Sequence, residues 1–315
     1  GFSSGSDTIR INGAAGNENI TSPSSVATTI DGGDGADMLI GGNANDVYIF
    51  DTNDVDAGES ITDSGGSADV VAIATTTDFV NMPNASLDNI EQIRFAGANQ
   101  TATFTGAQLT GETLSLTETA SGTSNLIINV ASGTTATFTN MSAGSGFSSG
   151  SDVITINAGG TSNIAGPDLA TTINGNSSGD VLSGGSKNDT INGLNGDDTI
   201  DGGDGSDALT GGVGSDVYLF NTNDVDANES ITEVSSDAGT DVVAIVTDTD
   251  FSNMTSNSFD NIEQIRFSGA NKTGTFTGLQ FTGETLELHE TSGGTSNLII
   301  NVGTGQTATF LNLSA

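Results

Sequence analysis

The 315-residue chain has 44 Gly, no Trp, three Pro and no Cys, which is the composition of a turn-rich β protein with a thin core. It carries 40 acidic residues against five Lys and Arg, and the net charge of -35 argues against nucleic acid and anionic membranes as partners and favours divalent cations. The lack of Cys excludes disulfides and thiol chemistry, and no apolar run approaches the ~18 residues of a membrane helix. Because the chain opens on Gly1 without Met or a signal-like segment, we expect it to be a portion of something longer.

The chain contains two similar copies, which we place at residues 1–145 and 146–315. GFSSGSD begins both copies, at Gly1 and Gly146, and NIEQIRF recurs at Asn89 and Asn261. The Gly/Ser-rich junction between them is short, and the strand-like VITIN follows at once. We therefore expect a continuous or gently kinked rod rather than two tethered domains.

A nine-residue unit recurs in both copies, with Gly in its first place, Asp in its sixth and an apolar or Tyr residue in its eighth. The first copy has two units, within about residues 30–50, and the second has five, within about 173–220. Matched residues are 143 positions apart at Ile30 and Ile173 but 170 apart at Tyr48 and Tyr218, so the second copy has gained three whole units. Insertion of whole units between undisturbed flanks predicts a solenoid of stacked coils.

Within a unit, we expect the first six residues to form a tight turn and the last three a short strand whose middle side chain points inward. Two units then make one coil, so that Asp180 shares an edge with Asp198, Asp189 with Asp207, and Asp198 with Asp216. Carboxylates and backbone carbonyls would face one another along this edge, and an all-oxygen ligand set favours Ca²⁺. The candidate ligands are Asp37, Asp46, Asp180, Asp189, Asp198, Asp207 and Asp216 in the sixth place, with Asp34, Asp204, Gly32, Gly33, Gly35, Gly41, Gly184, Gly193, Gly202, Gly203, Gly205 and Gly211 in the turns.

The segments GGDGADMLI, GGSKNDTIN, GDDTIDGGDGSDALT and GGVGSDVYL resemble the nonapeptide repeats of RTX proteins, whose pattern is GGxGxDxUx. The resemblance implies a parallel β-roll with several Ca²⁺ ions between stacked turns, type I secretion and folding outside the cell, as in bacterial surface-layer proteins and large adhesins. Five residues depart from the ideal turn, and one of them, Lys187, places a cation near a candidate site. The departures are Asn176, Ser178, Lys187, Leu194 and Val213.

Acidic segments follow the repeats in each copy. FDTNDVDAGES and NTNDVDANES would supply either a terminal Ca²⁺ site that closes the roll or a solvated acidic cap, and both interpretations stay open. The next segments, ITDSGGSADVVAI and ITEVSSDAGTDVVAI, would hold one more cation or form turns. The further candidate ligands are Asp51, Asp54, Asp56, Asp224, Asp226, Asp63, Asp69 and Asp241, in segments that also contain Glu59, Glu229, Glu233 and Asp237.

Short segments that alternate apolar with polar residues fill the rest of each copy, at 58–143 and 228–315. Their even spacing favours further solenoid coils, with a β-sandwich as the alternative. The predicted fold class is therefore all-β, a parallel β-roll or β-solenoid in two tandem copies. The residues expected to stack in its core as aromatics are Phe104, Phe138, Phe276 and Phe310.

The only histidine, His289, corresponds to Thr117 in the first copy and has no nucleophile in a recognisable context, so we expect no enzyme activity. We expect an extracellular, calcium-stabilised structural protein of a bacterial surface layer, surface filament or adhesin stalk. It would fold on binding Ca²⁺ after secretion and self-associate head to tail or laterally. The alternatives are the C-terminal repeat region of a secreted enzyme or toxin, and an adhesin module that binds cell-surface glycan.

Overall fold

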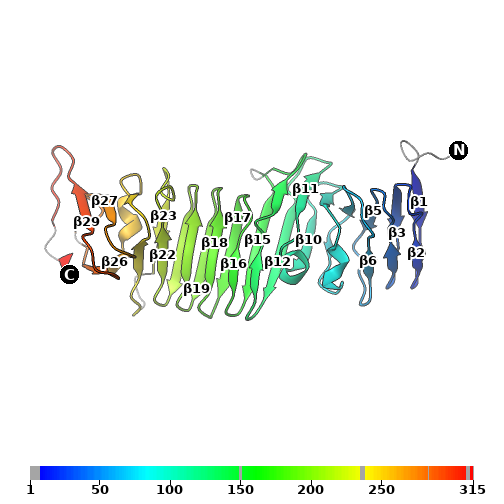
Figure 1. Ribbon diagram of the computed structural model, residues 1–315, viewed down its shortest axis with the longest axis horizontal. Coiled ribbons are helices and arrows are strands. Elements are labelled where there is room, and N and C mark those ends of the chain that lie inside the picture. Colours follow the sequence, from blue (N-terminus) through cyan, green and yellow to red (C-terminus); the bar gives the residue numbers. More distant parts are fainter. Residues whose placement is uncertain (1–7, 149–150, 235–237, 283, 310–312, 315) are drawn as a thin grey trace. The chain divides into compact units, whose positions relative to one another are not determined.

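The computed structural model describes all residues except 1–7, 149–150, 235–237, 283, 310–312 and 315. The chain divides into two compact units, residues 1–130 with 136–155, and residues 131–135 with 156–315. Each unit is a solenoid of short parallel strands joined by turns (Figure 1). Coils continue beyond the nonapeptides in both units, so the predicted all-β solenoid is confirmed and the β-sandwich alternative is wrong. The helical segments described are η1 (Asn84–Leu87), α1 (Gly106–Leu109) and η2 (Ser256–Phe259).

In the first unit, successive strands belong to different sheets because each half-coil carries the chain to another side of the solenoid. One sheet has the order β1-β3-β5-β7-β9-β11-β14, a second has the order β2-β4-β6, and β8, β10 and β12 lie side by side further along. The strands are β1 (Ile9–Asn12), β2 (Asn19–Thr21), β3 (Thr28–Asp31), β4 (Met38–Ile40), β5 (Val47–Phe50), β6 (Ser60–Thr62), β7 (Val70–Ile73), β8 (Thr77–Asp78), β9 (Gln92–Phe95), β10 (Thr101–Thr105), β11 (Leu114–Glu118), β12 (Asn125–Ala131), β13 (Thr135–Thr137) and β14 (Met141–Ala143).

The second unit alternates in the same way. Odd-numbered strands follow one another in the order β15-β17-β19-β21-β23, even-numbered strands in the order β16-β18-β20-β22-β24-β26-β28-β30, and β25-β27-β29 form a further sheet. The strands are β15 (Val153–Gly159), β16 (Asn163–Ala165), β17 (Thr171–Asn176), β18 (Val181–Gly185), β19 (Thr190–Asn195), β20 (Thr199–Gly203), β21 (Ala208–Val213), β22 (Val217–Phe220), β23 (Ser230–Thr232), β24 (Val242–Ile245), β25 (Thr249–Asp250), β26 (Gln264–Phe267), β27 (Thr273–Thr277), β28 (Leu286–Glu290), β29 (Asn297–Asn301) and β30 (Leu313–Ser314).

The eighth-place residues set the register between coils. Ile173 lies opposite Ile191, and Ile191 lies opposite Leu209, so each step is two units. All three side chains are at most 1% exposed. Because a slip of one residue would turn this buried row toward solvent, the row fixes the stacking of the turns as well.

The strands of the second copy are longer than the expected three residues, so the predicted division into six turn and three strand residues is wrong there. Strand β20 runs on through Gly202 and Gly203 into the next turn. Gly203 lies opposite Gly185, and a Cβ on Gly203, whose φ is 86°, would collide with the Gly185 carbonyl oxygen. Only glycine allows the strand ladder to continue at this point.

Beyond the nonapeptides the coils are wider, and aromatic side chains fill them. The rings of Phe79 and Phe104 stack at 4.5 Å between centroids, and those of Phe251 and Phe276 at 4.6 Å. Phe104, Phe138 and Phe276 are fully buried, as predicted, and Phe310 lies outside the described residues. In the part of the chain that the structure describes, no helix has both the length and the apolar character needed to cross a membrane.

Candidate metal centres

Each sixth-place carboxylate lies against the backbone of the preceding coil. Asp198 accepts a hydrogen bond at Oδ1 from the N–H of Asp180, at 2.6 Å, and its own N–H donates to Oδ1 of Asp216 at 2.8 Å. The N–H of Asp189 donates in the same way to Asp207, at 2.7 Å. The structure thus brings together the three pairs of aspartates expected to share an edge. We call this row of carboxylates bonded to backbone N–H groups the carboxylate ladder.

The other carboxylate oxygen, Oδ2, divides the ladder aspartates into two groups. In Asp37, Asp198 and Asp207 this oxygen is buried and has no hydrogen-bond partner among the described residues. In Asp189 it accepts the N–H of Gly185 at 2.9 Å, and in Asp180 it accepts the side-chain amide of Asn176 at 2.7 Å. A buried, unpartnered carboxylate oxygen carries a large desolvation penalty, so the first group has the greatest need of a cation.

Three of the five departures from the ideal repeat, Asn176, Ser178 and Lys187, lie in the turns of the second group, whereas Leu194 lies in the turn of Asp198. Asn176 occupies a place where the repeat pattern has Gly, and its side-chain amide donates to Asp180 Oδ2. Lys187 has an exposed side chain in the turn that precedes Asp189. The turns of Asp180 and Asp189 therefore satisfy both carboxylate oxygens within the protein.

The first glycine of each unit leaves room in front of Oδ2. A Cβ on Gly193 would collide both with Oδ2 of Asp198 and with the carbonyl oxygen of Gly211 in the next coil. A carboxylate oxygen and a carbonyl oxygen from neighbouring coils therefore converge on one point. The same arrangement recurs at Gly184, which lies under Asp189. Convergent carboxylate and carbonyl oxygens suit Ca²⁺, so the residues present fit this ion.

Burial raises the pKa of the ladder carboxyl groups. Desolvation is the largest cause at Asp198 and at Asp207, and it raises the pKa of each from the usual 3.8 to about 7. Backbone hydrogen bonds lower these pKa values, and neighbouring carboxylates, Asp216 at Asp198 and Asp224 at Asp207, raise them further. A bound divalent cation would offset the free-energy cost of holding these groups ionised in the folded chain.

Glutamates continue the ladder where the repeats end. Glu59 accepts the N–H of Asp37 at Oε2, and Glu229 accepts that of Asp207, both at 2.7 Å. The spacing between donor and acceptor is 22 residues here instead of 18, so a longer side chain makes the same bond across a wider coil. Oε1 of Glu229 is buried and has no hydrogen-bond partner in the part of the chain that the structure describes. Burial raises the pKa of Glu59 to about 8 and that of Glu229 to about 9.

Three further ladder residues were not predicted from the sequence. Glu91 accepts the N–H of Asp69 at 2.8 Å, and Glu263 accepts that of Asp241 at 2.8 Å. Asp152 accepts the N–H of Ser124 at 2.8 Å. The signal that identifies them is an acidic residue two positions before an inward-pointing apolar residue. This is the sixth-to-eighth relation of the nonapeptide without its glycines.

In the acidic loop that follows the repeats of each copy, one buried aspartate stabilises the loop itself. Asp54 accepts the N–H of Asp51 at 2.5 Å, and Asp224 accepts that of Asn221 at 2.5 Å. Asp54 and Asp224 are 4% and 6% exposed. The other candidates from this loop and from the turn tips have exposed side chains, namely Asp51, Asp56, Asp226, Asp34 and Asp204.

The remaining candidate metal ligands lie in two buried clusters. Asp46, Asp63 and Asp69 each offer an oxygen within 4.8 Å of the others. The hydroxyl of Tyr48 donates to Asp63 Oδ2 at 2.5 Å. The second copy repeats this arrangement with Asp216, Glu233 and Asp241, and with Tyr218 donating to Glu233. Asp237, expected in the same segment, lies outside the described residues.

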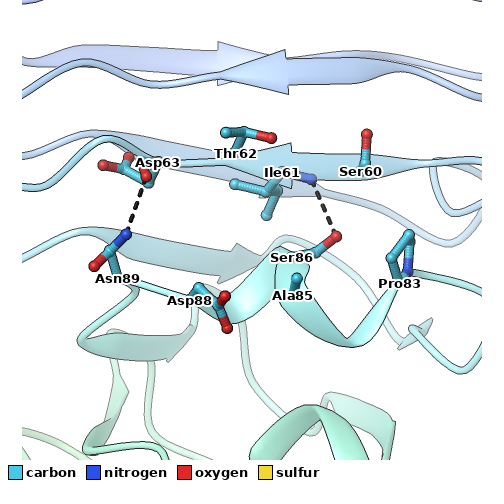
Figure 2. Close-up of a pocket in the computed structure, with 9 residues that line it drawn as sticks. All are labelled: Ser60, Ile61, Thr62, Asp63, Pro83, Ala85, Ser86, Asp88 and Asn89. Carbon is cyan, nitrogen blue, oxygen red and sulfur yellow. Dashed lines mark hydrogen bonds between the residues drawn. The ribbon is translucent and has the colours of Figure 1, made fainter.

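In the first copy, the coil that contains β6 contacts η1 and the residues after it through two hydrogen bonds. The N–H of Ile61 donates to Oγ of Ser86 in η1 at 3.3 Å, and the amide of Asn89 donates to the Asp63 carbonyl at 3.1 Å, as Figure 2 shows. The pocket between β6 and η1 has Asp63 and Asp88 as its charged lining residues.

Comparison with protein families agrees with this geometry. The model of the RTX calcium-binding nonapeptide repeat, in four copies, matches residues 27–52, 174–209 and 183–218. A search of curated proteins gave no significant match. The matched segments contain the turns in which buried carboxylates stack, and RTX nonapeptide repeats bind Ca²⁺. The chain therefore contains RTX-type calcium-binding nonapeptide repeats, at residues 27–52 and 174–218.

Proposed function

We propose that this chain is an extracellular structural segment of a bacterial surface layer, surface filament or adhesin stalk, which folds when it meets Ca²⁺ after secretion. RTX repeats are typical of secreted proteins. The observation that carries the proposal is the row of buried carboxylate oxygens at Asp37, Asp198 and Asp207, which have no hydrogen-bond partner within the described ranges. Such a row opposes folding unless cations occupy it.

Folding and Ca²⁺ binding are coupled in this account. At low Ca²⁺ the net charge of -35 and the buried carboxylates oppose the compact state. A site adds about 2.7 kcal/mol to the free energy of unfolding when the ion concentration is about 100 times the Kd, and several sites add together. The chain would stay unfolded at cytosolic Ca²⁺ and fold into a rigid solenoid at the mM Ca²⁺ outside the cell.

A structural rather than a catalytic role is supported by the placement of the single histidine. The His289 side chain is 54% exposed, and its Nε2 lies 3.8 Å from Glu287. Exposed placement beside one carboxylate gives neither the desolvation nor the oriented nucleophile that histidine catalysis uses. The three additional units of the second copy lengthen the calcium-binding rod without changing its flanks, which suits a spacer.

The proposal is tested by circular dichroism of the chain after EDTA treatment, at free Ca²⁺ from below 1 µM to 10 mM. We expect a disordered spectrum at cytosolic levels and a cooperative gain of β structure below mM Ca²⁺, with Mg²⁺ much less effective. A β spectrum and a melting temperature indifferent to Ca²⁺ would refute the proposal.

A further inference from the structure

The last nonapeptide of each copy differs from the other units in its core residue. Its eighth place holds Tyr, at Tyr48 and Tyr218, where the other units have Leu or Ile. These are the only tyrosines of the chain, and both are 0% exposed. The hydroxyl of Tyr48 donates to Asp63, directly after β6, at 2.5 Å. The hydroxyl of Tyr218 donates in the same way to Glu233, directly after β23.

Three acidic side chains meet beside each tyrosine, and each of them offers an oxygen within 4.8 Å of the other two. The carboxylates of the first copy are at most 6% exposed, and no basic side chain among the described residues forms an ion pair with them. Because buried carboxylates repel one another, each cluster requires bound protons or a bound cation. We call the two clusters the tyrosine sites, and their carboxylates are Asp46, Asp63 and Asp69 in the first copy and Asp216, Glu233 and Asp241 in the second.

The first tyrosine site contains an oxygen that the protein does not satisfy. Oδ1 of Asp69 accepts the N–H of Asp46 at 2.6 Å, whereas Oδ2 of Asp69 is buried and has no hydrogen-bond partner within the described ranges. The other two carboxylates are oriented by backbone donors. Asp63 accepts the N–H of Gly65 at 2.8 Å, and Asp46 accepts that of Gly42 at 2.8 Å. The backbone thus holds the three carboxylates in place and leaves Oδ2 of Asp69 available to a ligand.

The first glycine of the same unit keeps the space between these oxygens open. A Cβ on Gly41 would collide with the Tyr48 hydroxyl and with Oδ2 of Asp63. It would also meet Oδ2 of Asp46. The corresponding three groups of the second copy converge in the same way at Gly211. Two carboxylates and a hydroxyl from separate parts of the chain therefore face one glycine in each copy.

We propose that each tyrosine site binds one cation, and that it prefers trivalent over divalent cations more strongly than the nonapeptide turns do. Two of the three carboxylates of each site follow the residues that match the RTX repeat, so these sites are additional to the repeat turns. At a turn glycine such as Gly193, one carboxylate and one carbonyl oxygen converge instead. The tyrosine sites therefore have the higher negative charge, which favours ions of higher charge. Asp63 also lines the pocket between β6 and η1, which gives the first site a route to solvent (Figure 2).

The test uses Tb³⁺ as the probe, because an excited tyrosine transfers its energy only to a Tb³⁺ ion bound close to it. The chain has no Trp, so tyrosine-sensitised emission reports the tyrosine sites, whereas directly excited emission reports every bound Tb³⁺ ion. The chain is kept in mM Ca²⁺, and circular dichroism establishes that it is folded. Tb³⁺ is then added stepwise to replace Ca²⁺.

Two variants and a matched control assign the emission. Asp63→Asn keeps a carbonyl oxygen for the Tyr48 hydroxyl but removes one negative charge from the first site. Glu233→Gln makes the equivalent change in the second site. Asp88→Asn is the control, because Asp88 is exposed on the same pocket as Asp63 and the change of charge is the same.

We expect the sensitised emission of the wild type to reach its plateau at roughly two Tb³⁺ ions per chain, and at a Tb³⁺ concentration about tenfold below that needed to load the other sites. Each variant should lose about half of the plateau, the double variant should lose nearly all of it, and Asp88→Asn should retain it. A folded wild type without sensitised emission would overturn the inference and show that the clusters hold protons instead.

Two further outcomes would also count against the inference. Emission that survives in the double variant would exclude these carboxylates as the ligands. Emission that grows only in parallel with the loading of the other sites would overturn the preference for trivalent ions. The wild-type titration decides the inference even where a variant fails to fold. Because the readout is binding to the folded chain, the outcome is independent of an extracellular role and of calcium-coupled folding.

Discussion

Replacing Asp198 with Asn should stabilise the chain without Ca²⁺, and most or all of this gain should disappear with Ca²⁺. Asn keeps a carbonyl oxygen to accept the N–H of Asp180, so the ladder hydrogen bond survives. It removes the buried negative charge at Oδ2, which is both the source of the desolvation penalty and the candidate ligand for the ion. Without Ca²⁺ the variant should be more stable than the wild type, and with Ca²⁺ this difference should largely or wholly disappear.

The magnitude follows from the pKa. The carboxyl group is 1% exposed, and burial raises its pKa from the usual 3.8 to about 7. At pH 7 or above, holding the group ionised in the folded chain therefore destabilises it by about 4 kcal/mol, which is an upper limit for the gain on substitution. With Ca²⁺ at about 100 times the Kd, loss of one site should lower the free energy of unfolding by about 2.7 kcal/mol, which largely or wholly cancels the gain.

The assay is urea unfolding followed by circular dichroism, in EDTA with a stabilising osmolyte and again in mM Ca²⁺. Asp204→Asn is the matched control, since it makes the same change of charge at an exposed turn tip and should leave both midpoints nearly unchanged. If Ca²⁺ stabilised Asp198→Asn as much as the wild type, or if the variant were destabilised equally in both media, Asp198 would not be a ligand.

Three other predictions can be checked with the same methods. In EDTA, the free energy of unfolding should fall as the pH rises from about 4.5 to about 9. The pKa of Glu59 is raised to about 8 and that of Glu229 to about 9, so over this range the folded chain holds protons that the unfolded chain releases. A free energy of unfolding that rises over this range would contradict the burial of these groups. Gly193→Ala should weaken Ca²⁺ binding and destabilise the Ca²⁺-loaded chain by about 1–3 kcal/mol, because the added methyl group meets Asp198 Oδ2 and the Gly211 carbonyl. The control Gly293→Ala, whose methyl group meets nothing within 4 Å, should be neutral. Equal effects of the two variants in calorimetric Ca²⁺ titrations would count against the site. Deletion of residues 184–210, three whole units, should leave a folded chain that binds roughly two or three fewer Ca²⁺ ions, because stacked coils tolerate such losses; an unfolded product would show that the units are not interchangeable.

The repeat geometry could be predicted because the sequence repeats its chemistry with a constant period. Every ninth residue from Ile173 to Tyr218 points inward, and Ile173, Ile191 and Leu209 stack accordingly. The same period put Asp180, Asp198 and Asp216 on one edge, where they form the ladder. Burial of one face therefore determined both the core and the placement of the carboxylates.

The different hydrogen-bonding of the two oxygens of each carboxylate could not be predicted. The sequence shows that Asp198 is in register, but not that Oδ1 is taken by a backbone N–H while Oδ2 stays unpartnered. At Asp180 a nearby Asn176 changes that outcome entirely. Such differences depend on sub-ångström placement of side chains, which a residue pattern does not specify.

The glutamate part of the ladder was missed because the coils widen beyond the repeats. Glu91 and Glu263 make the ladder bond without a nearby glycine pair and at spacings that are not multiples of nine. Longer strands in the second copy escaped prediction for a related reason, since Gly203 reads as a turn residue until its close approach to Gly185 is known. In both cases the contact between coils, and not local sequence, decides the structure.

The central claim is that the buried oxygens of the ladder hold Ca²⁺. The most direct measurement is an anomalous difference map from crystals grown in Ca²⁺, recorded at a long wavelength. The account predicts a peak about 2.3–2.6 Å from Oδ2 of Asp198, shared with the Gly211 carbonyl oxygen, and an equivalent peak at Asp207. Crystals of the folded chain in mM Ca²⁺ with no anomalous peak at either carboxylate would contradict it.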